Sequence, residues 1–241
     1  MLKKLFKKIP YPPEFDITVY LRYQPILAKI SQLNKPKIAE VGSGSYGIGP
    51  YLKKSFSGFD INFSKKKSPF LKPVIASAIK IPKKFYQKFD LVLSVDMMEH
   101  LSPKDRSRSL ANLVSLTKKH LLVAFPTGQG ASLVDRILDW YYQKTHQKRL
   151  GFLLEHRRYP LPKTGEIKDQ LITIINNNNR QITSLKIINN TNLLVYLVLL
   201  LLGFSEKRYL TRIYSLTFFI RKILSKINLF PYRKMIILEL T

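Results

Sequence analysis

A glycine-rich segment, residues 40–49, is the part of the sequence best suited to hold a ligand. It reads EVGSGSYGIG and follows a short apolar stretch, so a buried strand would lead directly into a turn. Gly42 and Gly44 carry no side chain, and backbone N–H groups can therefore approach a ligand closely. Asp60 ends the next apolar stretch, where one carboxylate can accept both hydroxyls of a ribose. No Gly-Lys-Ser/Thr follows the glycines, which excludes a phosphate-binding P-loop.

Glu99 and His100 form a pair of side chains suited to acid–base chemistry. They follow an apolar run that ends at Asp96. Because imidazole titrates near neutral pH, His100 is the candidate general base, and Glu99 is the residue that would orient it. Packing at the start of a helix is the simpler role for His100, and both interpretations stay open.

A second group of charged side chains, EHRR at 155–158, combines a possible base with two cations. His156 beside Glu155 would be a polarised base, and the arginines would clamp a phosphate or a carboxylate. A capped loop with solvated charges is the alternative. Nothing in the spacing requires this group to meet residues 99–100, so the sequence predicts no metal site. The candidate catalytic residues are therefore Glu99, His100 and His156, and the candidate substrate-binding residues are Glu155, Arg157 and Arg158.

Short apolar strands must position these residues. Between 36 and 126 such strands alternate with helical or loop stretches, which indicates a parallel sheet covered on both faces. Ser102 and Pro103 predict a helix start, because serine caps a helix and proline suits its first turn. The predicted strands are 37–41, 57–61, 73–76, 89–95, 120–125, 182–188 and 234–240, and a helix is predicted over 131–142.

Four of these segments resemble the class I S-adenosylmethionine-dependent methyltransferases of the type 11 group. AEVGSGSYGIGPYL, GFDINF, ASAIKIP and FDLVLSVDMMEHLSP occur in that family's order and spacing over 38–125. The resemblance implies an α/β fold, a doubly wound and mostly parallel sheet of about seven strands with an antiparallel last strand, and S-adenosyl-L-methionine as cofactor. The expected parts are a basic N-terminal segment (1–35), a cofactor-binding core (36–126), a substrate-side lid (127–192), a helical insertion (193–230) and a final strand (231–241).

The resemblance also implies which residues line the cofactor site. Asp60 would hold the ribose hydroxyls, Ile61 would lie against the adenine, and Asp96 would face the sulfonium end. Two positions depart from the family pattern: Tyr46 replaces the third glycine, and Ser77 replaces an acid that reads the adenine. The full implied set is Glu40, Gly42, Ser43, Gly44, Asp60, Ile61, Ser77, Ala78 and Asp96, with Glu40, Gly42 and Gly44 as walls of the methionine and ribose site.

The charge of the chain points to a polyanionic partner. Forty-one Lys and Arg against 15 Asp and Glu give a formal net charge of +26. The segment 1–9 is basic with apolar residues on one helical face, and 208–227 is a basic amphipathic pattern beside an apolar run at 193–204. That run has about 12 apolar residues, which is too few to span a bilayer. These features favour an anionic membrane surface, with compositional drift towards lysine as the alternative.

The predicted function is methyl transfer to a small-molecule, glycan or lipid-linked acceptor at a membrane surface, with an oxygen atom as nucleophile. An RNA methyltransferase is the competing enzyme, with the basic charge on the phosphate backbone. A degenerate methyltransferase fold that only binds is the non-enzymatic alternative. The absence of cysteine excludes disulfides, thiolate metal sites and cysteine nucleophiles. The expected location is cytoplasmic, peripheral to the inner face of the membrane. The sequence leaves the oligomeric state open.

Overall fold

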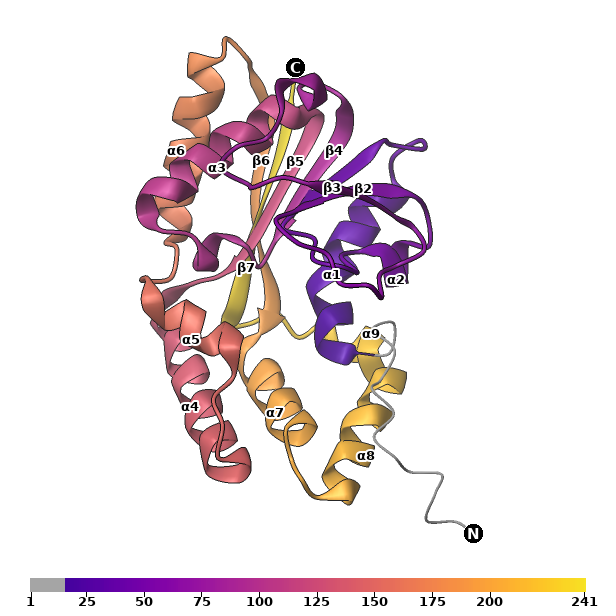
Figure 1. The fold of residues 1–241 in the computed structure, drawn as a ribbon, viewed down its shortest axis with the longest axis vertical. Coiled ribbons are helices and arrows are strands. Elements are labelled where there is room, and N and C mark those ends of the chain that lie inside the picture. The colour runs from indigo at the N-terminus through magenta and orange to yellow at the C-terminus, as the bar shows by residue number, and fades with distance from the viewer. Residues whose placement is uncertain (1–15) are drawn as a thin grey trace.

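Seven strands form one mixed sheet at the centre of the molecule (Figure 1). They are β1 (Ile38–Val41), β2 (Phe56–Asp60), β3 (Leu71–Ile75), β4 (Phe89–Val95), β5 (Thr117–Pro126), β6 (Ile182–Asn192) and β7 (Pro231–Leu240). Their order is β3-β2-β1-β4-β5-β7-β6 in this computed structural model, which describes residues 16–241. Neighbours among β1 to β5 pair in parallel, whereas β7 runs antiparallel to β5 and β6. The predicted sheet with its antiparallel last strand is confirmed. The amphipathic segment expected at 1–9 lies outside the described residues.

The central strands are buried on both faces, which explains their near-continuous apolar sequences. Successive side chains of a strand point to opposite faces of a sheet. In β4, Leu91 and Leu93 therefore pack into the core on one face, and Val92 packs into the core on the other. Leu122 and Leu121 of β5 divide in the same way, and all five side chains are fully buried. A run such as 89–95 can thus be apolar throughout and still form a strand.

Helices cover the two faces of the sheet (Figure 1). The face that carries Val92 is covered by α3 (Pro103–Leu116) and α6 (Thr164–Asn177). The opposite face is covered by α1 (Ile17–Ser31) and α2 (Gly49–Leu52). This three-layer arrangement places the carboxyl ends of β1, β2 and β4 at one edge of the sheet, where α/β proteins bind their ligands.

The predicted helix start at Ser102 is confirmed. Its hydroxyl accepts a hydrogen bond of 3.2 Å from the backbone N–H of Asp105, and Pro103 occupies the first turn. The cap matters for the site because it ends the segment that follows β4. Thus α3 begins at Pro103, with two residues between it and the end of η4 (Met98–His100), and its position is fixed by packing against the sheet.

Helix α1 packs into the core, although it lies within the range 1–35 that was predicted as a basic N-terminal segment. Asp16 caps the helix, accepting a hydrogen bond of 2.9 Å from the backbone N–H of Thr18. Ile17 and Ile26 are fully buried. The sequence-based division gave weight to the lysines of the first nine residues, whereas the spacing of apolar residues after Asp16 is typical of a helix that packs on a sheet.

A second group of helices lies below the sheet in Figure 1. It consists of α4 (Gly128–His146), α5 (Gly151–Arg158), α7 (Leu193–Gly203), α8 (Arg208–Leu216) and α9 (Arg221–Leu224). The last three confirm the predicted helical insertion before the final strand. The apolar run at 193–204 is α7, which buries Tyr196, Leu199 and Leu200 and leaves Leu194 and Val198 more than half exposed. No helix within the described part of the chain has both the length and the apolar character needed to cross a bilayer.

Candidate functional site

The glycine-rich turn after β1 leaves open space above its backbone. Gly42 has φ +77° and Gly44 has φ +54°, conformations that side-chain-bearing residues rarely adopt. A Cβ atom on Gly42 would lie 2.8 Å from Cγ of Met97, so this glycine is required for packing against the segment after β4. A Cβ atom on Gly44 would meet nothing within 4 Å. The turn is therefore closely packed at Gly42 and open at Gly44, which leaves room for a ligand at the second glycine.

Asp60 holds this turn from the end of β2. Its Oδ2 accepts a hydrogen bond of 2.8 Å from the backbone N–H of Gly44, and its Oδ1 accepts one of 2.8 Å from the backbone N–H of Ile61. Oδ1 also accepts a longer hydrogen bond of 3.4 Å from the backbone N–H of Asn62. A carboxylate has about four acceptor positions, so one remains for a ligand hydroxyl. Beside it, the Ile61 side chain is 73% exposed. A carboxylate next to an exposed apolar side chain suits a ribose joined to a flat base.

Glu40 supports the turn from within the core. It is fully buried, its Oε1 accepts a hydrogen bond of 2.6 Å from the Tyr23 hydroxyl, and its Oε2 accepts one of 2.8 Å from the backbone N–H of Ile48. Burial raises the pKa of Glu40 to about 7, against the lowering effect of these hydrogen bonds. These contacts position the turn, and the expected role of Glu40 as a wall of the methionine and ribose site stays a prediction.

The remaining residues of the implied cofactor set lie around this turn and at the end of β3. Ser43 is buried and its hydroxyl donates to the carbonyl of Gly44 at 3.0 Å. Ser77 follows β3, and the carbonyl of Ala78 accepts a hydrogen bond of 2.9 Å from Nδ2 of Asn112 on α3. The side chain of Asn112 thus fixes the segment where an adenine-reading acid is absent.

Asp96 lies at the end of β4, as expected, but its carboxylate faces two arginines. It is held in a left-handed conformation with φ +51°. Arg233 of β7 donates to both of its oxygens, through Nε and through Nη2 at 2.6 Å, and Nε of Arg22 lies 3.2 Å from Oδ2. Burial alone would raise the pKa of Asp96, but the two guanidinium groups outweigh burial and hold it below its usual value.

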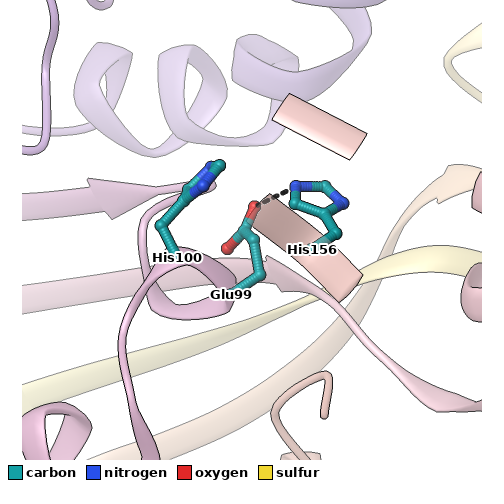
Figure 2. A group of neighbouring side chains, drawn as sticks. All are labelled: Glu99, His100 and His156. Carbon is teal, nitrogen blue, oxygen red and sulfur yellow. Dashed lines mark ion pairs between the residues drawn. The ribbon is translucent and has the colours of Figure 1, made fainter. Parts of the chain in front are cut away.

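Glu99, His100 and His156 converge beyond the end of β4 (Figure 2). Glu99 and His100 belong to the 3₁₀ helix η4 (Met98–His100), and His156 comes from α5. Each residue offers one ligand-type atom, and these atoms lie within 4.8 Å of one another. Nε2 of His156 lies 3.8 Å from Oε1 of Glu99. The spacing along the sequence did not require these two segments to meet, and the fold brings them together.

Acidic residues support both imidazole rings of this cluster. Nδ1 of His156 lies 2.8 Å from Oδ2 of Asp135 on α4, and Oδ1 of Asp135 accepts a hydrogen bond of 2.7 Å from the Tyr232 hydroxyl. Oε2 of Glu155 lies 2.7 Å from Nδ1 of His100. Burial, followed by the charge of Asp96, raises the pKa of Glu99 well above its usual value. Burial and the neighbouring His156 lower the pKa of His100.

Solved structures of methyltransferases have the same arrangement of strands and helices. The phosphoethanolamine N-methyltransferase 2 of Haemonchus contortus, in complex with phosphomonomethylethanolamine and S-adenosylhomocysteine, is 12% identical with a TM-score of 0.54, covering 100% of this chain and 60% of that one. A small RNA methyltransferase is 12% identical with a TM-score of 0.52, covering 90% of this chain and 25% of that one. This chain has the class I methyltransferase fold. No protein-family model and no curated protein matches the sequence.

In this methyltransferase fold, the two predicted substrate arginines differ in their surroundings. Arg157 forms an ion pair with the buried Asp139, with 2.9 Å between Nη1 and Oδ2. Arg158 lies over the ring of Tyr159, 5.6 Å from its centroid. Both line a cavity of about 300 Å³ that also contacts Asp135 and His156. The cavity adjoins the Glu99–His156 pair, so it is the candidate acceptor side of the site.

Several residues of this site were missed by sequence reasoning. Arg233 directly precedes the predicted last strand, 234–240, beside Lys234, and the sequence gives no sign that its side chain is buried. Asp135 and Tyr232 carried no signal either, since each becomes relevant only when α4 and β7 meet. Arg22 lies on the helix that was assigned to a peripheral segment, and so it was overlooked with that helix.

Proposed function

We propose that the chain is an S-adenosylmethionine-dependent methyltransferase whose acceptor atom is an oxygen of a small-molecule, glycan or lipid-linked compound presented at a membrane surface. The observation that carries this proposal is the pairing of Asp60 with Gly44 beside open space. A carboxylate fixed at the end of β2, next to a turn that no side chain fills, matches the shape and polarity of an adenosyl ligand.

The bound cofactor would supply a methyl group already activated by the sulfonium charge. The chain has to hold it and to align an acceptor with it in a water-poor cleft. Asp60 would accept a ribose hydroxyl, and the exposed Ile61 would cover one face of the adenine. Met97, which packs against Gly42, and Met98 are buried, so they would keep water from that side of the turn.

The acceptor would bind on the side of Glu99, His100 and His156. A hydroxyl acceptor loses one proton when its oxygen forms a bond to the methyl carbon, and the carbon–sulfur bond breaks to leave S-adenosylhomocysteine. An oxygen nucleophile therefore needs a place for that proton. The two imidazoles of this cluster would provide it, since the raised pKa of Glu99 favours the protonated form of that carboxyl. Asp135 fixes the ring of His156, which adjoins the acceptor cavity.

The membrane part of the proposal rests on an apolar and basic surface between β6 and β7. Large apolar side chains that are more than 40% exposed lie on α7, α8, α9 and the segments that join them, and basic residues interleave with them. Such a surface suits anionic lipid head groups, with each nearby Lys or Arg worth about 1 kcal/mol. We name it the insertion surface; its apolar members are Leu194, Val198, Tyr209, Ile213, Leu216, Phe219, Ile220, Ile223, Ile227, Leu229 and Phe230.

Calorimetry with S-adenosylhomocysteine tests the cofactor site. We expect micromolar binding that Asp60→Ala weakens at least tenfold. Asp90→Ala is the matched control. Asp90 also accepts a backbone hydrogen bond, from the N–H of Lys37 at 2.8 Å, but it lies at the start of β4, at the edge of the sheet away from the candidate site. Equal binding by the wild type and Asp60→Ala would contradict the site as drawn. Absence of any binding by the wild type would favour a fold used only for protein contacts.

Vesicle flotation tests the membrane part separately. We expect binding to vesicles that contain anionic lipid and little binding to neutral vesicles at the same salt concentration. Phe219→Glu and Ile223→Glu should reduce flotation, since both side chains are more than 60% exposed on the insertion surface. Tight binding to RNA together with no flotation would instead support an RNA acceptor.

A further inference from the structure

We propose that Glu99, His100 and His156 bind a divalent transition-metal ion at the acceptor side of the cleft. The proposal deepens the proposed function: a bound ion would occupy the imidazole nitrogens and would itself acidify an acceptor hydroxyl that it holds, in place of direct proton uptake by these side chains. Binding of the ion can be measured without methyl transfer. The three side chains come from two segments, η4 and α5, that the fold brings together at the carboxyl end of β4 (Figure 2). Two imidazoles and one carboxylate form a donor set common to zinc and to other first-row divalent ions.

The spacing of the ligand-type atoms suits a single ion. Nitrogen and oxygen ligands lie about 2.0–2.2 Å from such an ion, so two ligands of one ion are at most about 4.4 Å apart. The three atoms here lie within 4.8 Å of one another, with 3.8 Å between Glu99 and His156. In tetrahedral geometry two such ligands are about 3.4 Å apart, so ion binding would draw the side chains together by up to about 1.4 Å. His100, whose side chain is 30% exposed, has room for that movement.

The carboxylate of Glu99 is the observation that calls for a ligand. Glu99 is fully buried, and among the described residues neither of its oxygens has a hydrogen-bond partner. The distance of 3.8 Å to His156 is too long for a hydrogen bond. A buried polar group without a partner is costly, and such groups are rare in folded proteins unless a ligand, ion or water completes them. In Figure 2 the carboxylate of Glu99 lies between the two imidazole rings.

Residues behind the cluster hold it in a form that can bind an ion. Oδ2 of Asp135 lies 2.8 Å from Nδ1 of His156 and forms a hydrogen bond with it. The other ring nitrogen, Nε2, lies 3.8 Å from Oε1 of Glu99 and is available as a ligand. A carboxylate behind a ligating histidine is a common arrangement in metal sites. Tyr232 in turn fixes Asp135 through a hydrogen bond of 2.7 Å. On the other side, the exposed Glu155 contacts His100 and adds a second carboxylate at the rim.

The charge of the cluster also favours a cation. The chain has 15 acidic residues against 41 basic ones, yet Glu99, Asp135 and Glu155 gather around two histidines. The nearby Asp96 is already neutralised by Arg22 and Arg233. Imidazole donors favour Zn²⁺, Fe²⁺, Ni²⁺ or Cu²⁺ over Mg²⁺ and Mn²⁺, which prefer oxygen ligands.

Titration calorimetry of chelator-treated protein with Zn²⁺, Mn²⁺ and Mg²⁺ tests the site without any need for methyl transfer. We expect one equivalent of Zn²⁺ to bind, Mn²⁺ to bind more weakly, and Mg²⁺ not to compete at equal concentration. Glu99→Gln and His100→Gln should each weaken Zn²⁺ binding at least tenfold. Asp135→Asn should weaken it roughly 10- to 100-fold by releasing His156. His100 is only half-buried, so its variant is expected to fold, and circular dichroism confirms this for each protein.

The two histidines outside the cluster provide the control. His120 lies on β5 and His146 at the end of α4, and His100 and His156 complete the four histidines of the chain. The double variant H120Q/H146Q should bind Zn²⁺ like the wild type. Loss of binding in this control, unchanged binding in both Glu99→Gln and His100→Gln, or no stoichiometric binding by the wild type would each overturn the proposal.

Discussion

Arg233 of β7 and Asp96 at the end of β4 form a buried ion pair in which the guanidinium group donates to both carboxylate oxygens. The pair joins the last strand to the edge of the sheet that carries the candidate site. Arg22 of α1 contributes a second cation. The carboxylate of Asp96 is therefore bound both by a helix, α1, and by a strand, β7. The ion pair therefore belongs to the framework of the site, and its loss should affect stability first.

Substitution of Arg233 should destabilise the fold. Arg233→Met leaves Asp96 with only Arg22, and removal of one partner of a buried ion pair typically costs about 3 kcal/mol or more. Lys234→Met is the control, since the next residue of the strand points to the opposite face. Urea unfolding followed by circular dichroism measures both. A loss of less than about 1 kcal/mol for Arg233→Met would contradict a structural role for the pair.

Glu40 should make stability depend on pH near neutrality. Its folded-state pKa is raised by burial to about 7 from 4.5, so the folded chain binds more protons than the unfolded chain between these values. Stability should therefore fall as pH rises from about 4.5 to 7, by roughly 3 kcal/mol for this group. Glu40→Gln should flatten that part of the curve, measured by unfolding at several pH values. An unchanged slope would show that Glu40 is not the titrating group.

Gly44 should separate ligand binding from stability. A methyl group there meets no atom within 4 Å, so Gly44→Ala should cost only about 1 kcal/mol for its left-handed backbone. The same methyl group would occupy the space proposed for the cofactor, and S-adenosylhomocysteine binding should fall at least tenfold. Gly42→Ala provides the contrast, since its Cβ atom would lie 2.8 Å from Met97 and should lower the melting temperature more. Full binding by Gly44→Ala would place the ligand elsewhere.

Binding to anionic vesicles should have one part that salt weakens and one part that salt leaves unchanged. Attraction of Lys and Arg to lipid head groups is screened within about 10 Å at 0.1 M salt, so flotation should fall as salt is raised. The contribution of buried apolar area is not screened. Phe219→Ser and Phe230→Ser should therefore reduce the residual flotation at high salt, since both side chains are more than 75% exposed. Flotation that is abolished by salt in the wild type would point to a purely electrostatic contact.

Local patterns were sufficient to predict the sheet and its ligand edge. The apolar run 89–95 and the turn at Gly42 and Gly44 each form from neighbouring residues, and the structure has both where they were predicted. Helix α1 was missed because the basic residues before it dominated the interpretation of the N-terminal region. Its apolar face becomes recognisable only as the cover of a sheet.

The meeting of Glu99 with His156 could not be predicted in the same way. It depends on α5 turning back over the end of β4, where the fully buried Leu153 packs in a cluster with residues of α4 and β7. No spacing along the sequence encodes that contact. The same holds for Arg233 and Asp96, whose pairing requires β7 to enter the sheet beside β5.

The placement of β7 between β5 and β6 has a consequence for synthesis of the chain on the ribosome. Strands β1 to β5 can pair as they emerge, but β6 has no strand partner in the sheet until residues 231–240 have been made. Arg233 and Tyr232 arrive with that strand, so the counterion of Asp96 and the hydroxyl that fixes Asp135 are the last parts to be added. Until then, the edge of β5 and the whole of β6 remain unpaired, and the nascent chain is at its most prone to aggregate.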